Sequence, residues 1–157
     1  MNQNTNKIAQ AGIIAAGYTV LSLISLLFGQ SPEAIVQLRL SEALCILPVF
    51  TVSAVPGLFV GCLLSNLLCG ASILDVALGS IATLIGAILT RKLKDEGKWA
   101  FLPPIVANAL IIPFVMKFSY GLSYGYIPMM FYVAISEFIS CFLLGLIVRK
   151  QIKKIWS

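Results

Sequence analysis

Histidine is absent from this 157-residue chain, and Asp, Glu, Lys and Arg together make up only 11% of it, against about 25% in soluble domains. The absence of histidine removes the commonest general base and the commonest metal ligand. The scarcity of charge, beside 59% hydrophobic residues, excludes a water-soluble globule, a disordered tail and a coiled coil. We therefore expect an all-α integral membrane protein.

Motifs of catalysis are also missing. The only Gly-Lys pair, Gly97-Lys98, has Lys92 where a phosphate-binding P-loop needs glycine and Trp99 where it needs Ser or Thr. The four cysteines lie in apolar runs without metal-ligand spacing, which favours a packing role. We expect no cofactor, no metal site and no ATP hydrolysis by the chain itself. An intramembrane enzyme is a weak alternative because no nucleophile motif is present.

The apolar runs predict a single transmembrane domain over residues 1–157. At about 20 residues per span, the chain has room for at most six spans. The stretch from Arg39 to Cys69 is too long for one span and too short for two full ones. Pro56-Gly57 favours a break there, although charge alone fits five or six spans equally well. The six predicted helices cover about 8–28, 39–53, 57–69, 74–92, 100–118 and 127–150.

Positive charge is concentrated in three places. Nine of the eleven Lys and Arg residues lie near the chain ends or in the segment 91–98, and Arg39 and Lys117 are the exceptions. Loops rich in Lys and Arg stay on the cytoplasmic side, so we expect both termini in the cytoplasm of a multi-pass protein. This distribution indicates membrane topology rather than nucleic-acid binding.

The Asp, Glu and Asn residues within the predicted spans fall in the outer half or near the midplane. They are Glu42, Asn66, Asp75, Asn108 and Glu137. A charge at the bilayer centre costs about 2.5–3.5 kcal/mol on insertion scales, so Glu137 should face protein or a water-filled pocket. The arrangement predicts a cavity open to the outside and closed toward the cytoplasm.

Each of these residues also has an ordinary structural interpretation. Asn66 and Asn108 could form hydrogen bonds between helices, and Asp75 could cap the helix that follows it. Arg39 and Glu42 could form a surface ion pair. The aromatic residues could form a belt at the membrane interface instead of contacting a ligand; they are Phe28, Tyr120, Tyr124, Tyr126 and Tyr132.

Small residues recur in the first predicted helix as Ala11-x-x-x-Ala15 and Gly12-x-x-x-Ala16. Such spacing lets helix backbones approach closely in lipid. Most motifs of this kind serve internal packing, but this one could also bind a partner subunit.

Four segments of the chain, in the same order, resemble the QueT family. They are RLSEAL (39–44), AVPGLFVGCLLSNLL (54–68), LDVALGSIATLIGA (74–87) and PPIVANAL (103–110). The resemblance covers about residues 5–150. QueT proteins are S components of energy-coupling factor (ECF) transporters associated with uptake of a queuosine precursor. The resemblance implies a six-helix S-component bundle in the bacterial cell membrane, a membrane coupling subunit, two cytoplasmic ATPases, and docking through Ala11 and Ala15.

The resemblance also implies an aminomethyl deazaguanine as substrate. Its ring edge carries N–H donors and its aminomethyl group is a cation, so two carboxylates, Glu42 and Glu137, are expected to bind it. Amides would contact the remaining edge and aromatic rings would stack on the ring plane. The predicted substrate-binding residues are Glu42, Glu137, Asn108, Asn66, Asp75, Arg39, Tyr120, Tyr124 and Phe28; the predicted docking residues are Ala11, Ala15, Gly12 and Ala16.

Two other functions fit the same residues. The first is an S component for another vitamin or a nucleobase. The second is a stand-alone proton-coupled carrier that uses Glu137 as its relay.

Overall fold

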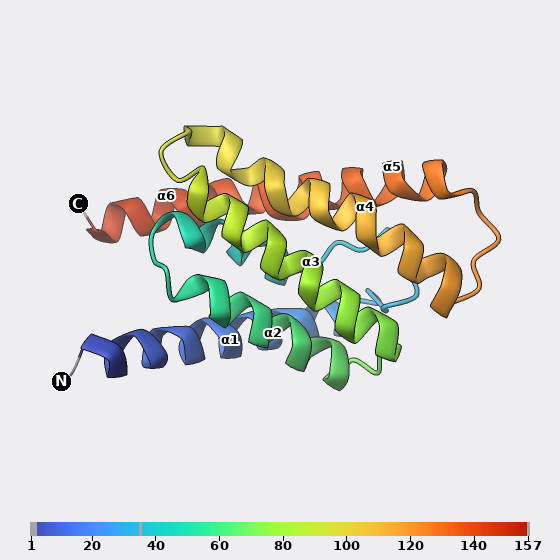
Figure 1. Ribbon diagram of the computed structural model, residues 1–157, viewed down its shortest axis with the longest axis horizontal. Helices are drawn as coiled ribbons and strands as arrows, with labels where there is room; N and C mark the ends of the chain where they lie inside the picture. The colour runs from blue at the N-terminus through green and yellow to red at the C-terminus, as the bar shows by residue number, and fades with distance from the viewer. Residues whose placement is uncertain (1–2, 35, 157) are drawn as a thin grey trace.

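The computed structural model describes residues 3–34 and 36–156, which form helices joined by short segments (Figure 1). Figure 1 also shows that the helices lie along the long axis of the molecule and that both chain ends lie at one end of it. The all-helical prediction is confirmed for the described residues. The α-helices are α1 (Gln3–Leu27), α2 (Ala54–Leu68), α3 (Ile73–Lys92), α4 (Leu102–Ser119), α5 (Tyr126–Glu137) and α6 (Leu144–Trp156). Two 3₁₀-helices, η1 (Leu40–Val49) and η2 (Gly97–Phe101), and a π-helix, η3 (Phe138–Leu143), complete the list.

Four helical stretches are long and apolar enough to cross a membrane: Gln3–Leu27, Ile73–Lys92, Gly97–Ser119 and Tyr126–Lys154. The helices η1 and α2 are apolar but shorter. At a rise of about 2.0 Å per 3₁₀ residue and 1.5 Å per α residue, each extends only about 20 Å, less than the roughly 30 Å hydrocarbon core. Multiple membrane spans are thus supported, and the count of six stays a prediction.

The segment between Arg39 and Cys69 differs in detail from the expectation. The chain turns at residues 50–53, and Pro56 lies in the first turn of α2, where its missing N–H leaves no hydrogen bond unmade. The predicted helix over 39–53 is a 3₁₀-helix, η1, with Pro48 inside it. A proline cannot donate to the carbonyl four residues earlier, so its position does not favour a regular α-helix here.

The last predicted helix continues further than expected. Elements α5, η3 and α6 follow one another without interruption from Tyr126 to Trp156. The π-helical turn η3 begins directly after Glu137. Such wider turns within α-helices are frequent at functional sites.

Glycines set the close contact between α1 and α2. A Cβ atom added at Gly57 would lie 2.8 Å from the Ala11 carbonyl oxygen, and one at Gly61 would lie 2.8 Å from the Cβ of Tyr18. Both distances are shorter than real Cβ contacts, so these positions admit only glycine without a shift of the helices. The α1–α2 contact in turn places Tyr18 in the core, where it is fully buried.

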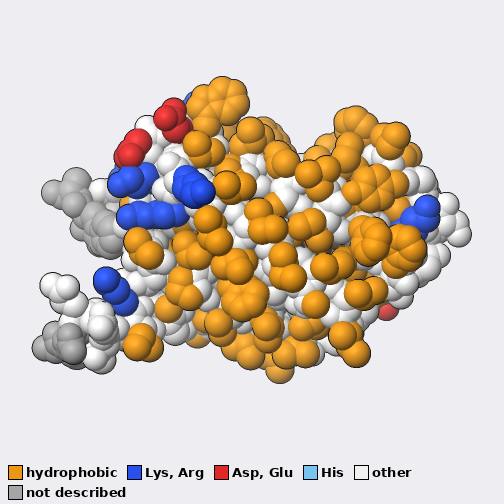
Figure 2. All heavy atoms as spheres, viewed as in Figure 1, with side chains coloured by type: hydrophobic (Ala, Val, Ile, Leu, Met, Phe, Trp, Pro, Cys, Tyr) orange, Lys and Arg blue, Asp and Glu red, His pale blue; other side chains and the backbone are white. Residues whose placement is uncertain are grey.

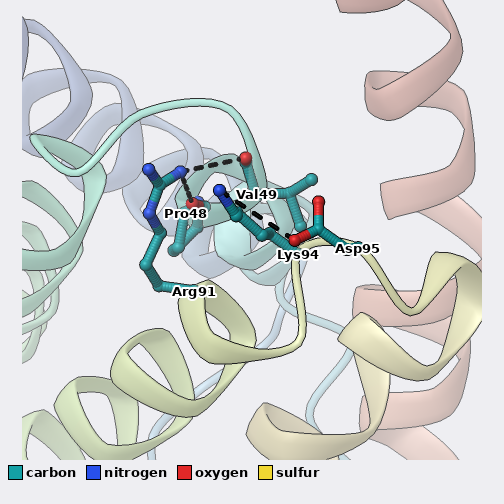
Figure 3. A network of polar contacts seen from close by, with 5 residues as sticks. All are labelled: Pro48, Val49, Arg91, Lys94 and Asp95. Atoms are coloured by element: carbon teal, nitrogen blue, oxygen red, sulfur yellow. Dashed lines mark hydrogen bonds and ion pairs between the residues drawn. The ribbon is translucent and has the colours of Figure 1, made fainter.

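Basic side chains gather at the end of the molecule that holds the termini, and apolar side chains cover most of the rest of the face in Figure 2. At the last turn of α3, the Nη1 atom of Arg91 donates to the carbonyl oxygens of Pro48 (3.0 Å) and Val49 (3.1 Å), beside a Lys94–Asp95 pair at 4.0 Å (Figure 3). These carbonyls end η1 and have no partner within that helix. Arg91 therefore fixes the end of η1 to α3.

Candidate substrate-binding site

A small cavity lies inside the bundle where η1, α2, α3, α4 and α5 meet. Its free space is about 20 Å³ for the centre of a water molecule, room for about one water. Polar side chains from separate elements converge on it. The lining residues are Gln37, Arg39, Glu42, Cys62, Gly79, Thr83, Asn108, Ile112, Val133, Ser136 and Glu137.

Glu137, the last residue of α5, enters this cavity from the end of an apolar helix. Its Oε1 atom accepts a hydrogen bond of 2.8 Å from the Asn108 side chain of α4. Its Oε2 atom is buried and has no hydrogen-bond partner among the described residues. A buried acceptor without a donor costs about 1–3 kcal/mol, so this oxygen is the least satisfied polar atom of the cavity wall.

Glu42 on η1 is buried as well, but both of its oxygens have donors. The Tyr18 hydroxyl donates to Oε1 at 2.5 Å, and the Cys45 thiol donates to Oε2 at 3.0 Å. Tyr18 therefore orients Glu42 from the α1 side. The two carboxylates of the cavity therefore differ in their hydrogen bonding. Glu42 has donors on both oxygens, whereas Glu137 keeps Oε2 as an unused acceptor.

Arg39 begins a second set of polar contacts beside the cavity. Its guanidinium donates to the Asn66 side-chain oxygen at 3.3 Å, and the Asn66 amide donates to the carbonyl of Asp75 at 3.3 Å. The Tyr120 hydroxyl donates to the Asp75 carboxylate at 3.0 Å and accepts from the Ser72 backbone N–H at 3.1 Å. Burial raises the pKa of Tyr120, which keeps its hydroxyl protonated as a donor. This set joins four segments around Arg39.

The ordinary interpretations of Arg39 and Asp75 are not what the structure shows. Ser72 caps α3 through its side chain, which accepts from the Asp75 N–H, so Asp75 is not the cap. Arg39 forms no ion pair within 4.0 Å in the described part of the chain and bonds to Asn66 instead. Among the aromatic residues that could form an interfacial belt, Tyr126 donates its hydroxyl to the Leu110 carbonyl.

The structure divides the predicted binding residues into three groups. Four of them line the cavity: Arg39, Glu42, Asn108 and Glu137. Three lie behind Arg39 in the contact set just described: Asn66, Asp75 and Tyr120. The other two, Phe28 and Tyr124, are 77% and 55% exposed and do not reach the cavity. The cavity lining among described residues contains no aromatic ring.

Some residues of the site were missed from the sequence. Tyr18, Gln37, Thr83 and Ser136 either line the cavity or orient a carboxylate. Tyr18 offered a signal, because a phenol in the middle of the apolar first helix needs a hydrogen-bond partner when buried. The hydroxyl residues offered none, since Ser and Thr in membrane helices commonly bond to their own backbone, as Ser136 does with the Tyr132 carbonyl.

The small residues of α1 lie on two different faces. Ala15 is buried against Gly61 of α2, and Ala11 is half-buried against Gly57. Gly12 and Ala16 are exposed. The first pair therefore serves packing within the chain, and the second pair belongs to a free surface.

Comparison with known proteins gives one match. Residues 8–154 match the family described as QueT transporter. Neither curated proteins nor solved structures give a significant match. The matched region spans nearly the whole chain, and the four apolar helices agree with a multi-pass membrane protein. The chain therefore belongs to the QueT transporter family.

Proposed function

We propose that this chain is the substrate-binding S component of an ECF-type importer and that it binds a queuosine precursor, an aminomethyl deazaguanine, from the outer side. The observation that carries the proposal is the cavity in which Glu137 presents a buried, unpartnered oxygen beside Glu42, Asn108 and Arg39. The family match supports transport. Substrate identity, outer-side binding and ECF coupling are the proposal.

The two carboxylates suit the two kinds of donor on such a ligand. A guanine-like edge offers neighbouring N–H donors, and the aminomethyl group is a cation. Glu137 can accept a ligand donor at Oε2 without giving up its bond to Asn108. Glu42 would accept a further donor while Tyr18 and Cys45 hold it in place. The carboxylate that takes the cation is the one whose replacement weakens binding of the aminomethyl compound more than binding of guanine.

The ring of the ligand would pack against aliphatic rather than aromatic walls. Ile112 and Val133 line the cavity, and Gly79, which has no side chain, lines it as well. A Cβ at Gly79 would lie 3.0 Å from an Asp75 carboxylate oxygen and 3.1 Å from the Asn66 amide. A side chain at Gly79 would therefore crowd the Asp75 carboxylate and the Asn66 amide.

The cavity must widen to admit a bicyclic ring, since it holds about one water. Two wall residues, Gln37 and Arg39, lie outside the helices, in the segment between α1 and η1. This segment is joined to η1 by a backbone hydrogen bond of 3.2 Å from the Glu42 N–H to the Arg39 carbonyl. We propose that it gives way when the substrate enters.

Binding measurements on the purified chain test the substrate site. Each protein is titrated with an aminomethyl deazaguanine, with guanine and with several vitamins. The test variants are Glu137→Gln and Glu42→Gln, and the control is Glu33→Gln, at an exposed position. Loss of a charged hydrogen-bond partner costs about 1.5–3 kcal/mol, so each buried variant should weaken binding about 10- to 150-fold. The exposed variant should bind normally. Affinities within about twofold of wild type for both buried variants would refute the site.

Coupling to a partner subunit would use the exposed face of α1. Gly12 and Ala16 are open there, whereas a large side chain at Ala15 would push against α2. We expect Gly12→Trp with Ala16→Trp to abolish uptake in cells that contain the coupling subunit and the two ATPases, with substrate binding retained. Val60→Trp, on the exposed face of α2, is the matched control. Normal uptake by the double variant would refute docking at this face.

The proton-coupled carrier has one observation in its favour, because Glu137 is a buried carboxylate inside a membrane-spanning rod. Uptake separates the two functions. An S component transports only with its ATPases and copurifies with the coupling subunit, whereas a carrier transports alone and responds to the proton gradient.

A further inference from the structure

A second hollow lies on the outside of the bundle, at the end that holds the termini. It has a volume of about 380 Å³, within the range of small-ligand sites. Apolar side chains of α4 and of the α5–η3–α6 rod line most of it, and Lys98 and Trp99 of η2 lie at its rim. Its lining is Lys98, Trp99, Phe101, Leu102, Ile105, Phe138 and Phe142.

Three aromatic rings form the floor of this hollow. Phe138 and Phe142 stack with their centroids 4.9 Å apart, and Phe101 meets Phe142 edge to face at 5.3 Å. Phe101 itself is held over Gly145 of α6, where an added Cβ would lie 2.7 Å from its ring. These ring contacts give the hollow, or groove, a continuous aromatic floor.

Among the described residues of the lining, Lys98 provides the only charged side chain. It is exposed, and the single ion pair found among the described residues joins Lys94 to Asp95 instead. Arg149 stands next to the groove, with its guanidinium 6.0 Å from the Phe101 centroid and bonded to the Gly97 carbonyl at 2.6 Å. The rim therefore carries Lys98 and Arg149, while Asp95 and Glu96 lie in the preceding loop, and Figure 2 shows basic and acidic side chains side by side at this end of the molecule.

Trp99 marks the level of this rim in the membrane. It is 67% exposed beside Lys98, and tryptophan is enriched where hydrocarbon meets the headgroups. Phe138 lies four residues further from the charged end than Phe142 on the same rod, about 6 Å along the helix axis. The groove thus runs from an interfacial rim that holds Lys98 and Trp99 into the apolar region.

We propose that this groove binds one anionic phospholipid, with its phosphate at Lys98 and an acyl chain along Phe142 and Phe138. A positive side chain and a tryptophan at one end of an apolar groove complement the two parts of such a lipid. A zwitterionic phospholipid would fill the groove equally well but would lose the net attraction to Lys98. The proposal does not depend on the substrate, since the groove and the internal cavity share no lining residue.

Fluorescence quenching in vesicles tests this site. The chain has two tryptophans, so Trp156→Phe leaves Trp99 as the single reporter. The protein is placed in phosphatidylcholine vesicles that contain equal fractions of acyl-brominated phosphatidylglycerol or acyl-brominated phosphatidylcholine. We expect the quenching isotherm of Trp99 to show about a fivefold preference for brominated phosphatidylglycerol over brominated phosphatidylcholine. This ratio corresponds to the attraction of one basic side chain to an anionic lipid surface.

Variants of Lys98 separate a bound lipid from general attraction to the surface. Lys98→Gln should remove the preference and Lys98→Arg should keep it. Lys117→Gln, which removes an exposed positive charge at the end of α4, should have no effect. Equal quenching by the two lipids, or an unchanged preference in Lys98→Gln, overturns the proposal. Equal quenching is also the result expected if a partner protein is the natural occupant of the groove.

Discussion

The close contact between α1 and α2 gives a quantitative prediction for Gly61→Ala. The new Cβ would lie 2.8 Å from the Cβ of Tyr18 and 3.0 Å from the Ala15 carbonyl oxygen. The first distance is about 0.6 Å less than the 3.4 Å at which ordinary contact begins. Neither neighbour is the end of a flexible side chain, so α1 as a whole must move. Overpacking of this kind costs about 1–3 kcal/mol.

Gly12→Ala is the matched control, because a Cβ at Gly12 meets nothing within 4 Å. Both variants replace a helical glycine of this helix pair by alanine, so both gain the same helix propensity, about 0.5–1 kcal/mol. The difference between them then measures packing alone. We expect Gly61→Ala to be less stable than Gly12→Ala by about 1–3 kcal/mol.

Equilibrium unfolding of the two variants, by titration with sodium dodecyl sulfate in mild detergent and with helicity as the signal, measures this difference. The displaced Tyr18 should also loosen its 2.5 Å bond to Glu42, so substrate binding should weaken in Gly61→Ala and not in Gly12→Ala. Equal stability of the two variants, or a more stable Gly61→Ala, would show that the α1–α2 contact is looser than these distances indicate.

Two further variants test the contacts that position the site. Tyr18→Phe removes a hydrogen-bond donor from the buried Glu42. This variant should lose about 1.5–3 kcal/mol of unfolding free energy in the same titration. If Tyr18→Phe costs equally much in a Glu42→Gln background, the two residues are not linked. Arg91→Gln removes the hydrogen bonds to the last carbonyls of η1 and should speed hydrogen exchange in η1. The control Lys92→Gln, at an exposed residue, should leave this exchange unchanged. Unchanged exchange in Arg91→Gln would argue against a role of Arg91 in fixing η1.

Residue types predicted the polar part of the site better than the aromatic part. Carboxylates and amides inside apolar helices are costly, so Glu42, Asn108 and Glu137 were identifiable without any contact information. Aromatic residues carry no such cost at a membrane surface. Phe28 and Tyr124 therefore looked equally suited to a ligand or to the interface, and the structure leaves both exposed.

Helix limits were predictable where an apolar run ended in charge or glycine, as at the end of α3. The helix limits within 39–69 were less predictable, because both candidate helices are mostly apolar and Pro48 and Pro56 could each mark a break. The structure puts the turn at 50–53 and forms η1 as a 3₁₀-helix. Arg91, 43 residues away from Pro48, completes the end of that helix, a contact that no local pattern reveals.

The sequence by itself determined the solvent, the helical class and the end at which positive charge gathers, because these depend on composition and on order along the chain. Only the tertiary structure decided which side chains meet. A helix that is apolar all round gives no sign of which face meets protein and which meets lipid, since both surroundings are equally apolar. The rotation of each helix is set instead by close contacts such as Gly61 on Tyr18, and these bring Glu42 and Glu137 to one cavity from elements far apart in the chain.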